Sequence, residues 1–350
     1  MRLALFVVSP LVLHLISHPA AAQWNAQSSS TAVELRGLSV VSPSVAWASG
    51  QQGTVIRTID GGRTWMAGTV AGAATLDLRA IAAISARTAF AMSIGDSSRI
   101  FRTTDGGRTW SPRFVSTRKG SFLDAIRFWD ARHGIAVSDP VDGKFLVVTT
   151  SDGGDTWQEA PAAAMPPALS NEGAFAASGS CLAVRSRGDA WFVTGGASIA
   201  RVFHSTDFGK SWTVSNSPIR SESAAQGIFS VAFRDAMHGV ISGGDYGKAA
   251  LGGRNVALTS DGGRTWTLVD SAASPQGFRS AVDFVPGTKG HELVAVGLNG
   301  TDRSHDGGLT WTATDSVPYN SLQFNGRTGF VVGPKGRVAA ALFTLRSIKR

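Results

Sequence analysis

The sequence predicts an all-β fold, a seven-bladed β-propeller of four-stranded antiparallel blades that is closed by the N-terminal strand. Three observations predict it: six copies of an eight-residue motif, a nearly regular spacing between them, and short apolar runs before each copy. The motif is an Asp box, at residues 58–65, 103–110, 150–157, 205–212, 259–266 and 304–311. Successive box aspartates lie 45, 47, 55, 54 and 45 residues apart, a period typical of repeat architectures.

The chain begins with features of an export signal. Residues 3–17 are mostly apolar, Arg2 precedes them, and three alanines at 20–22 resemble a cleavage site. Residues 1–22 are therefore interpreted as a secretory signal peptide, which predicts a periplasmic or secreted protein. No later stretch reaches the roughly 20 apolar residues that a membrane span needs. We expect residues 23–350 to form a single propeller domain.

Each repeat contains the pattern of four short strands. In the first repeat, apolar runs begin at Leu38, Val45 and Thr54, and a fourth strand follows Trp65. The next five repeats keep this order, whereas the seventh begins at Tyr319 and ends without a box. The segment after Trp24 can supply the missing fourth strand. This closure would remove the exposed sheet edges that otherwise favour aggregation.

The boxes themselves are interpreted as β-hairpin turns. The box carboxylate can accept hydrogen bonds from backbone amides two or three residues further on, and the glycine two positions after it permits a positive φ. The Trp five positions after the aspartate suits packing between adjacent sheets. We therefore expect the box aspartates to stabilise the fold and not to act in catalysis: Asp60, Asp105, Asp152, Asp207, Asp261 and Asp306.

Composition excludes several classes of partner and cofactor. The formal charge is +8, or +7 once Arg2 leaves with the signal peptide, but no arginine-rich run or nucleic-acid motif appears. The single cysteine, Cys181, cannot form an internal disulfide. The histidines lack metal-ligand spacing, and no dinucleotide fingerprint is present. We expect no metal, no cofactor, no nucleic-acid partner and a monomeric chain.

A binding face is expected opposite the boxes. The chain alternates direction within a blade, so the loops between the second and third strands share one face with the connections between blades. The third to fifth repeats carry insertions there, and insertions on one face of a repeat protein often mark the binding face. The candidate residues for binding a protein partner, a small ligand or a glycan are Arg36, Arg79, Asp124, Asp139, Asp142, Glu172, Glu222, Asp245, Tyr246 and Arg279.

The repeat also resembles a known family. An inner strand is followed by D-x-x-H-G, an apolar strand and the Asp box, most clearly at residues 128–134 and 233–239. This order resembles the Asp-box propellers related to the photosystem II stability and assembly factors. The resemblance implies a non-enzymatic propeller with an assembly, stability or scaffold role, and it covers residues 24–350.

A second function class shares the Asp box, the sialidase-type glycoside hydrolases. Such an enzyme would use a tyrosine nucleophile or a pair of carboxylates. The residues available for this chemistry are Asp124, Glu172, Glu222, Asp245 and Tyr246. An Arg-Ile-Pro motif near the first blade is absent, and no motif selects one carboxylate pair. We rank binding first and glycoside hydrolysis second.

Overall fold

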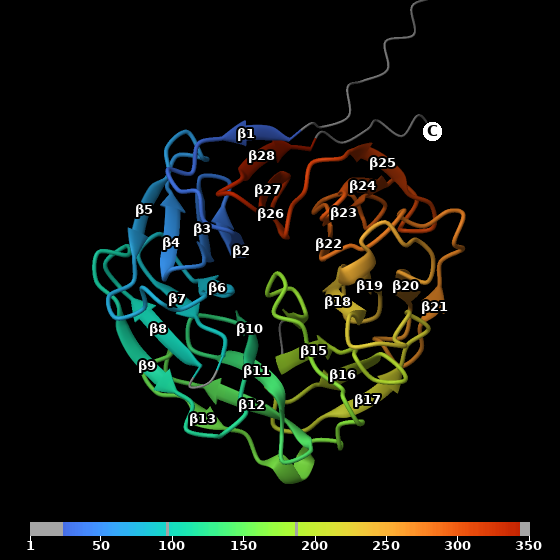
Figure 1. Ribbon diagram of the computed structural model, residues 1–350, viewed down its shortest axis with the longest axis horizontal. Helices are drawn as coiled ribbons and strands as arrows, with labels where there is room; N and C mark the ends of the chain where they lie inside the picture. Colours follow the sequence, from blue (N-terminus) through green and yellow to red (C-terminus); the bar gives the residue numbers. More distant parts are fainter. Residues whose placement is uncertain (1–23, 96–97, 186–187, 344–350) are drawn as a thin grey trace, which may run out of the picture.

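The computed structural model describes residues 24–95, 98–185 and 188–343. In this part of the chain, 28 strands form seven four-stranded antiparallel sheets arranged in a ring (Figure 1). The prediction of a seven-bladed propeller is confirmed. The proposed signal peptide, residues 1–22, lies outside the described residues.

The first three blades follow the chain from the ring centre outward. Blade 1 contains β2 (Leu35–Ser42), β3 (Val45–Gly50), β4 (Thr54–Thr58) and β5 (Met66–Thr69). Blade 2 contains β6 (Ala80–Ala83), β7 (Ala89–Met92), β8 (Arg99–Thr103) and β9 (Ser111–Val115). Blade 3 contains β10 (Leu123–Phe128), β11 (Gly134–Val141), β12 (Lys144–Thr150) and β13 (Gln158–Glu159).

The remaining blades repeat this order, with two short 3-10 helices in their connections. Blade 4 contains β14 (Leu182–Arg185), β15 (Asp189–Val193), β16 (Arg201–Ser205) and β17 (Thr213–Asn216). Blade 5 contains β18 (Gln226–Phe233), β19 (Gly239–Asp245), β20 (Val256–Thr259) and β21 (Thr267–Leu268). Blade 6 contains β22 (Ala281–Phe284), β23 (Leu293–Gly297), β24 (Gly300–Ser304) and β25 (Thr312–Asp315). The helices are η1 (Ala162–Ala164) and η3 (Tyr246–Lys248).

The seventh blade joins the two ends of the chain. It contains β26 (Ser321–Asn325), β27 (Thr328–Val332), β28 (Val338–Leu342) and, as its outermost strand, β1 (Asn25–Gln27). The β1 strand pairs antiparallel with β28, and Asn25 lies opposite Ala340. Figure 1 shows β1 and β28 side by side. The N-terminal strand therefore closes the ring, as the sequence predicts.

The core lies between neighbouring blades, where large aromatic rings meet. Trp110 follows the box of blade 2 and contacts Trp47 of blade 1 edge to face, with ring centroids 6.1 Å apart. Trp157 of blade 3 contacts Phe90 of blade 2 at 6.3 Å. Phe90 is fully buried and Trp47 is nearly so. The box tryptophans Trp110 and Trp157 thus lie between adjacent sheets, as predicted from the sequence.

The Asp box is held by side-chain hydroxyls as well as by amides. In the box of blade 4, Ser211 donates to Asp207 through its amide (2.9 Å) and its hydroxyl (2.5 Å). Lys210 N also donates to this carboxylate, at 2.9 Å. Ser205 Oγ donates to Asp207 at 2.8 Å and accepts from Gly209 N at 3.0 Å. The sequence-based prediction named amide donors two or three residues after the aspartate. The structure adds the amide four residues after it and two side-chain hydroxyls, and these contacts recur in the box of blade 2.

We predict that the Asp207 carboxylate stabilises the fold. Asp207→Ala is expected to lower the free energy of unfolding by about 0.5 to 2 kcal/mol, because it removes an acceptor shared by two backbone amides and two hydroxyls. Urea unfolding would measure the change. Lys210→Ala is the matched control, since its exposed side chain makes no hydrogen bond in the described part of the chain. Equal stability of the Asp207 and Lys210 variants would contradict the assignment.

Candidate functional site

The centre of the ring is filled by a loop from blade 4. Residues 171–181, here called the plug loop, precede β14 and extend into the middle of the ring (Figure 1). Ala174 N donates to Asp139 Oδ1 on blade 3 at 2.8 Å, and Ser178 Oγ donates to the carbonyl of Ser280 before blade 6 at 2.9 Å. The hydroxyl of Ser321 on blade 7 donates to the carbonyl of Ser178 at 2.9 Å. The plug loop is therefore anchored to blades on several sides of the channel.

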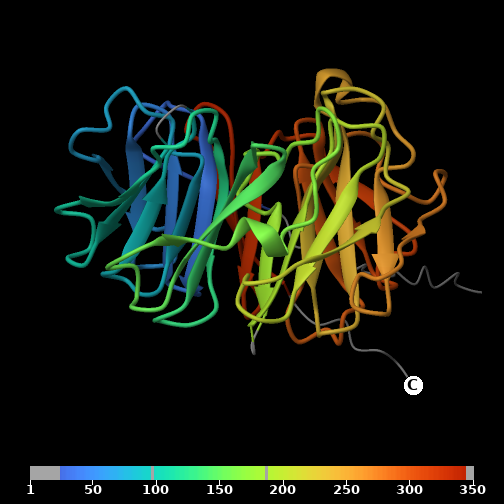
Figure 2. The same cartoon turned by 90° about the horizontal axis from the view of Figure 1, so that it is seen from below.

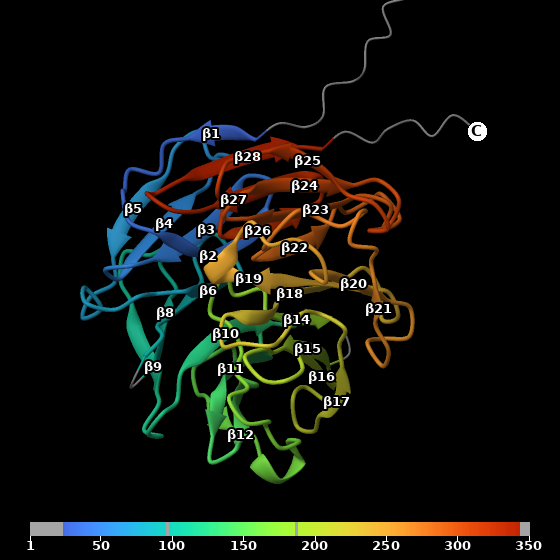
Figure 3. The same ribbon diagram turned by 45° about the vertical axis from the view of Figure 1, so that its right-hand side comes forward.

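A cavity of about 320 Å³, here called the central pocket, lies against the plug loop. Its lining includes Tyr246 of η3, which lies on the face opposite the Asp boxes, at the upper edge of the ring in Figure 2. Figure 3 shows that β14, which follows the plug loop, lies among the inner strands of the ring. The pocket is lined by Arg36, Arg79, Phe122, Ala174, Phe175, Ala176, Ala177, Phe229, Tyr246, Phe278, Ser280, Leu298 and Asn320.

Two arginines line one part of the pocket, and both were predicted from the sequence to lie on the binding face. Arg36 pairs with Glu34 at 2.8 Å and donates to the carbonyl of Ala177 in the plug loop at 3.2 Å. Burial lowers the pKa of Arg36, and the negative charge of Glu34 opposes this shift. Arg79 donates through Nε to Asp77 at 2.8 Å. Within the described residues, its two terminal nitrogens have no hydrogen-bond partner, so they are available to an anion.

Aromatic rings line the other part of the pocket. Phe175 of the plug loop stacks on Phe229 of β18, with centroids 3.9 Å apart and an interplanar angle of 13°. Tyr246 of η3 meets both rings edge to face, and Phe278 meets Phe229 in the same way at 4.7 Å. Of these residues, only Tyr246 was a candidate from the sequence. The phenylalanines were missed because an isolated Phe in a connecting segment resembles ordinary core packing.

Asp124 and Asp139 are not among the residues that line the pocket. Asp124 is fully buried at a β-bulge of β10, close to the backbone amides of Asp139 and Ala176. Burial and the nearby charge of Asp139 raise the pKa of Asp124 well above its usual value. Burial also raises the pKa of Asp139 to about 6, although its bond with Ala174 N opposes the shift. The pair therefore lies directly against the plug loop.

Two other candidate carboxylates hold loops in place. Glu172 is buried and accepts from Arg201 Nε at 2.8 Å and from Thr194 Oγ1 at 2.6 Å. Asp245 caps η3 by accepting from the amides of Gly247 and Lys248, at 2.9 and 3.0 Å. These contacts use the carboxylate oxygens inside the protein. Both residues therefore shape the binding face and neither lines the pocket.

The remaining candidates also lie away from the pocket. Arg279 is buried and forms an ion pair with Asp302, so its guanidinium is already occupied. Glu222 is exposed and pairs with Arg254 at 2.9 Å. Asp142 is exposed at the turn between β11 and β12. Of the ten sequence candidates, only Arg36, Arg79 and Tyr246 meet at one cavity.

The pocket chemistry suits binding better than hydrolysis. No aspartate or glutamate lines it within the described residues. A two-carboxylate glycosidase needs an acid and a base or nucleophile on opposite sides of one substrate bond. The central pocket instead presents guanidinium donors beside an apolar ring surface. This arrangement can hold an anionic group next to an apolar one.

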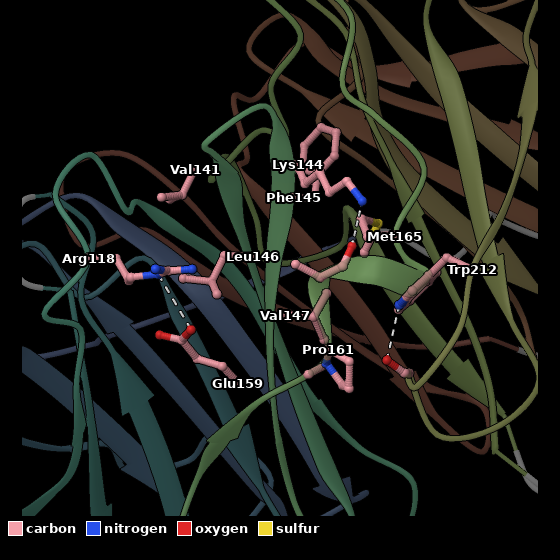
Figure 4. A pocket seen from close by; sticks show the side chains of 13 residues that line it. Arg118, Val141, Lys144, Phe145, Leu146, Val147, Glu159, Pro161, Met165 and Trp212 are labelled. Atoms are coloured by element: carbon pink, nitrogen blue, oxygen red, sulfur yellow. Dashed lines mark hydrogen bonds and ion pairs between the residues drawn. The ribbon is translucent and has the colours of Figure 1, made fainter.

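A second cavity, between blades 3 and 4, is lined by groups that already satisfy one another (Figure 4). It measures about 230 Å³. Lys144 Nζ donates to the carbonyl of Ala162 at 2.8 Å, and Arg118 pairs with Glu159 at 3.5 Å. Trp212 Nε1 donates to the carbonyl of Gly209 at 3.1 Å. Since its polar groups have partners within the protein, this cavity is a weaker candidate than the central pocket.

We predict that the buried carboxylates destabilise the fold at higher pH. A raised pKa means that the folded state binds the proton more tightly, so stability falls as pH rises from about 4, the unfolded pKa, to about 6 for Asp139. Asp139→Asn should match the wild type at pH 4 and exceed its urea midpoint at pH 8, since the amide oxygen can still accept from Ala174 N. Asp142→Asn, on the same hairpin but exposed, is the control. An equal pH slope in wild type and Asp139→Asn would contradict the prediction.

The box carboxylates act in the opposite direction. Bonds to the hydroxyl and amide of Thr64 lower the pKa of Asp60 to about 2. A lowered pKa contributes stability above the unfolded value, and this contribution is lost as pH falls from about 4 toward about 2. The two groups of carboxylates together predict maximum stability near pH 4, where these two windows meet.

A family model described as photosynthesis system II assembly factor YCF48 matches residues 16–120. The chain resembles the photosystem II assembly factors. A structure of YCF48 bound to a D1 peptide superposes with a TM-score of 0.65 at 19% identity, covering 92% of this chain and 97% of that one. YCF48 from Cyanidioschyzon merolae gives 0.66 at 20% identity, covering 92% and 99%.

The same fold also occurs in an enzyme. The GH74 enzyme of Niastella koreensis superposes with a TM-score of 0.54 at 12% identity, over 85% of this chain and 62% of that one. Identities this low establish the fold alone for all three structures. No curated protein sequence matches the chain significantly. Among the described residues, no helix is long and apolar enough to cross a bilayer, and no cluster of three metal-binding side chains occurs.

Proposed function

We propose that this chain is an exported, non-enzymatic propeller that binds an acidic segment of a partner protein in the central pocket. The observation that carries the proposal is the pocket itself, where Arg36 and Arg79 lie beside an aromatic wall and no acidic side chain lines the cavity within the described residues. The likeness to YCF48, one structure of which holds a D1 peptide, supports a peptide ligand. An assembly or scaffold role follows from such binding.

The positive net charge of the chain supports a negatively charged ligand. The formal net charge is +8, and Arg79 directs unpartnered donors toward the pocket. Exposed charges of one sign speed the encounter with an oppositely charged partner, and this steering weakens as salt increases. Export is supported by the features of residues 1–22, and sequencing of the mature protein should find Gln23 first. A monomer is the proposed state.

We predict that Arg79 contributes directly to ligand affinity. Arg79→Ala should weaken binding of a short capped peptide containing Asp and Phe about tenfold or more, because a charge-assisted hydrogen bond is lost. Peptide binding by Arg79→Ala should also depend less on salt concentration than binding by the wild type. Fluorescence anisotropy of the labelled peptide measures both effects. Arg108→Ala is the matched control, because Arg108 is exposed on the Asp-box face.

Two outcomes would overturn the proposal. Equal peptide affinity of wild type, Arg79→Ala and Arg36→Ala would show that the central pocket is not the site. Release of sugar from a glycan panel by the wild type would support the hydrolase alternative. Thermal unfolding of each variant would show whether the fold is retained, so that a binding loss can be assigned to the pocket.

A further inference from the structure

The aromatic wall of the central pocket is preformed. The rings of Phe175, Phe229, Phe278 and Tyr246 contact one another at centroid distances from 3.9 to 6.4 Å. Phe229 and Phe278 are almost fully buried, whereas Tyr246 is 50% exposed. A ligand ring could pack against Tyr246 without first ordering the wall. A wall of this kind favours a flat apolar side chain over a small one.

The plug loop connects the arginine side of the pocket to the aromatic wall. Arg36 donates to the carbonyl of Ala177, and Phe175 lies two positions earlier in the plug loop. A tight turn joins them, because Ala177 N donates to the carbonyl of Phe175 at 2.8 Å. The backbone of Phe175 therefore lies less than about 7 Å, the span of two extended residues, from that of Ala177, whose carbonyl Arg36 contacts. Side chains at positions i and i+2 of an extended strand share one face at about this spacing.

The size and charge of the pocket decide what occupies it. A volume of about 320 Å³ is at the lower end of the range for ligand pockets, so it accommodates one or two side chains. The terminal nitrogens of Arg79 favour a negative group, and the exposed edge of Tyr246 adds apolar surface beside it. An extended protein segment with an acid and an aromatic ring on the same face meets both requirements.

We propose that the central pocket binds an acidic side chain and an aromatic side chain that lie two positions apart in an extended segment of a partner protein. The acid binds the terminal nitrogens of Arg79, beside the Arg36 guanidinium that Glu34 and the Ala177 carbonyl hold in place, and the ring packs on Tyr246 and Phe175. Tyr246 thereby determines specificity for the ring. This inference rests on the proposed function and adds the ligand's chemistry and spacing to it.

The test compares capped peptides of one length. The first contains Asp-Gly-Phe, the second replaces Phe by Ala, the third replaces Asp by Asn, and the fourth separates Asp and Phe by several glycines. We expect the first to bind most tightly, with roughly a threefold to tenfold loss on removing the ring. Free phenylacetate should bind more weakly than the first peptide. Equal binding of phenylacetate would overturn the assignment to a protein segment, and equal binding of the first and fourth peptides would overturn the spacing.

The variants separate this inference from the proposed function. Tyr246→Ala should lower affinity for the Asp-Gly-Phe peptide by roughly threefold to tenfold and leave the Asp-Gly-Ala peptide unchanged. Tyr246→Phe should bind as the wild type does, since the Tyr246 hydroxyl has no hydrogen bond in the described part of the chain. Leu309→Ala, exposed on the Asp-box face, is the control. If Arg79→Ala weakens both peptides while Tyr246→Ala affects neither, the proposed function stands and the aromatic specificity fails.

Discussion

Deletion of residues 24–33 is expected to abolish cooperative folding of the ring. This segment contains β1, which covers the outer edge of β28. Trp24 packs against Phe343 with centroids 5.7 Å apart, and its indole nitrogen donates to Thr301 on blade 6 at 3.2 Å. Loss of a packed Trp alone costs about 3 to 5 kcal/mol. The deletion also exposes a strand edge that can pair with other chains, so aggregation should accompany the loss.

The measurement is thermal unfolding by circular dichroism together with size-exclusion chromatography. A circular permutant is the control: it joins Phe343 to Trp24 by a short linker and opens the exposed turn between Asp142 and Gly143. The permutant keeps β1 against β28 through a hairpin, so it should remain folded and monomeric. A deletion variant that unfolds at the wild-type temperature would show that β1 is dispensable for closure.

Much of the fold could be predicted because each repeat contains its own local signals. The Asp box defines one turn, the Trp after it begins a strand, and the apolar runs before it define the other strands. Closure could be inferred because the last repeat lacks one strand and Trp24 precedes an unassigned one. The sequence did not predict the hydroxyl bonds of Ser205 and Ser211, which appear only when the turn geometry is known.

The site was less predictable because its residues are brought together by the whole ring. Arg36, Arg79 and Tyr246 were found, since charged and phenolic side chains in connections between strands suggest binding. The plug loop was only partly predictable. The sequence shows extra length before β14, but it does not show that the small residues of 171–181 allow this loop to enter the channel. Burial of Asp124 depends on the plug loop and neighbouring strands, so its charge alone suggested an exposed site.

Glu172→Ala is expected to lower the free energy of unfolding by about 3 to 5 kcal/mol. The Glu172 side chain is completely buried and accepts from Arg201, from Thr194 and from Leu169 N, the last at 2.8 Å. Removal of the carboxylate leaves the Arg201 guanidinium buried without its anionic partner. Because Glu172 begins the part of the plug loop that reaches the pocket, local loosening should also weaken peptide binding. Urea unfolding and anisotropy would measure the two effects.

A double variant distinguishes a structural role from a catalytic one. Replacing both partners, as in Glu172→Ala with Arg201→Met, removes the uncompensated charge, so it should recover part of the lost stability. The difference between the stability change of the double variant and the sum of the two single-variant changes then measures the contribution of the ion pair. The hydrolase alternative requires a different result: Glu172→Gln would fold as the wild type does and lose activity on a glycan panel. Unchanged stability of Glu172→Ala would remove the structural explanation for this buried carboxylate, because the explanation rests on its ion pair with Arg201.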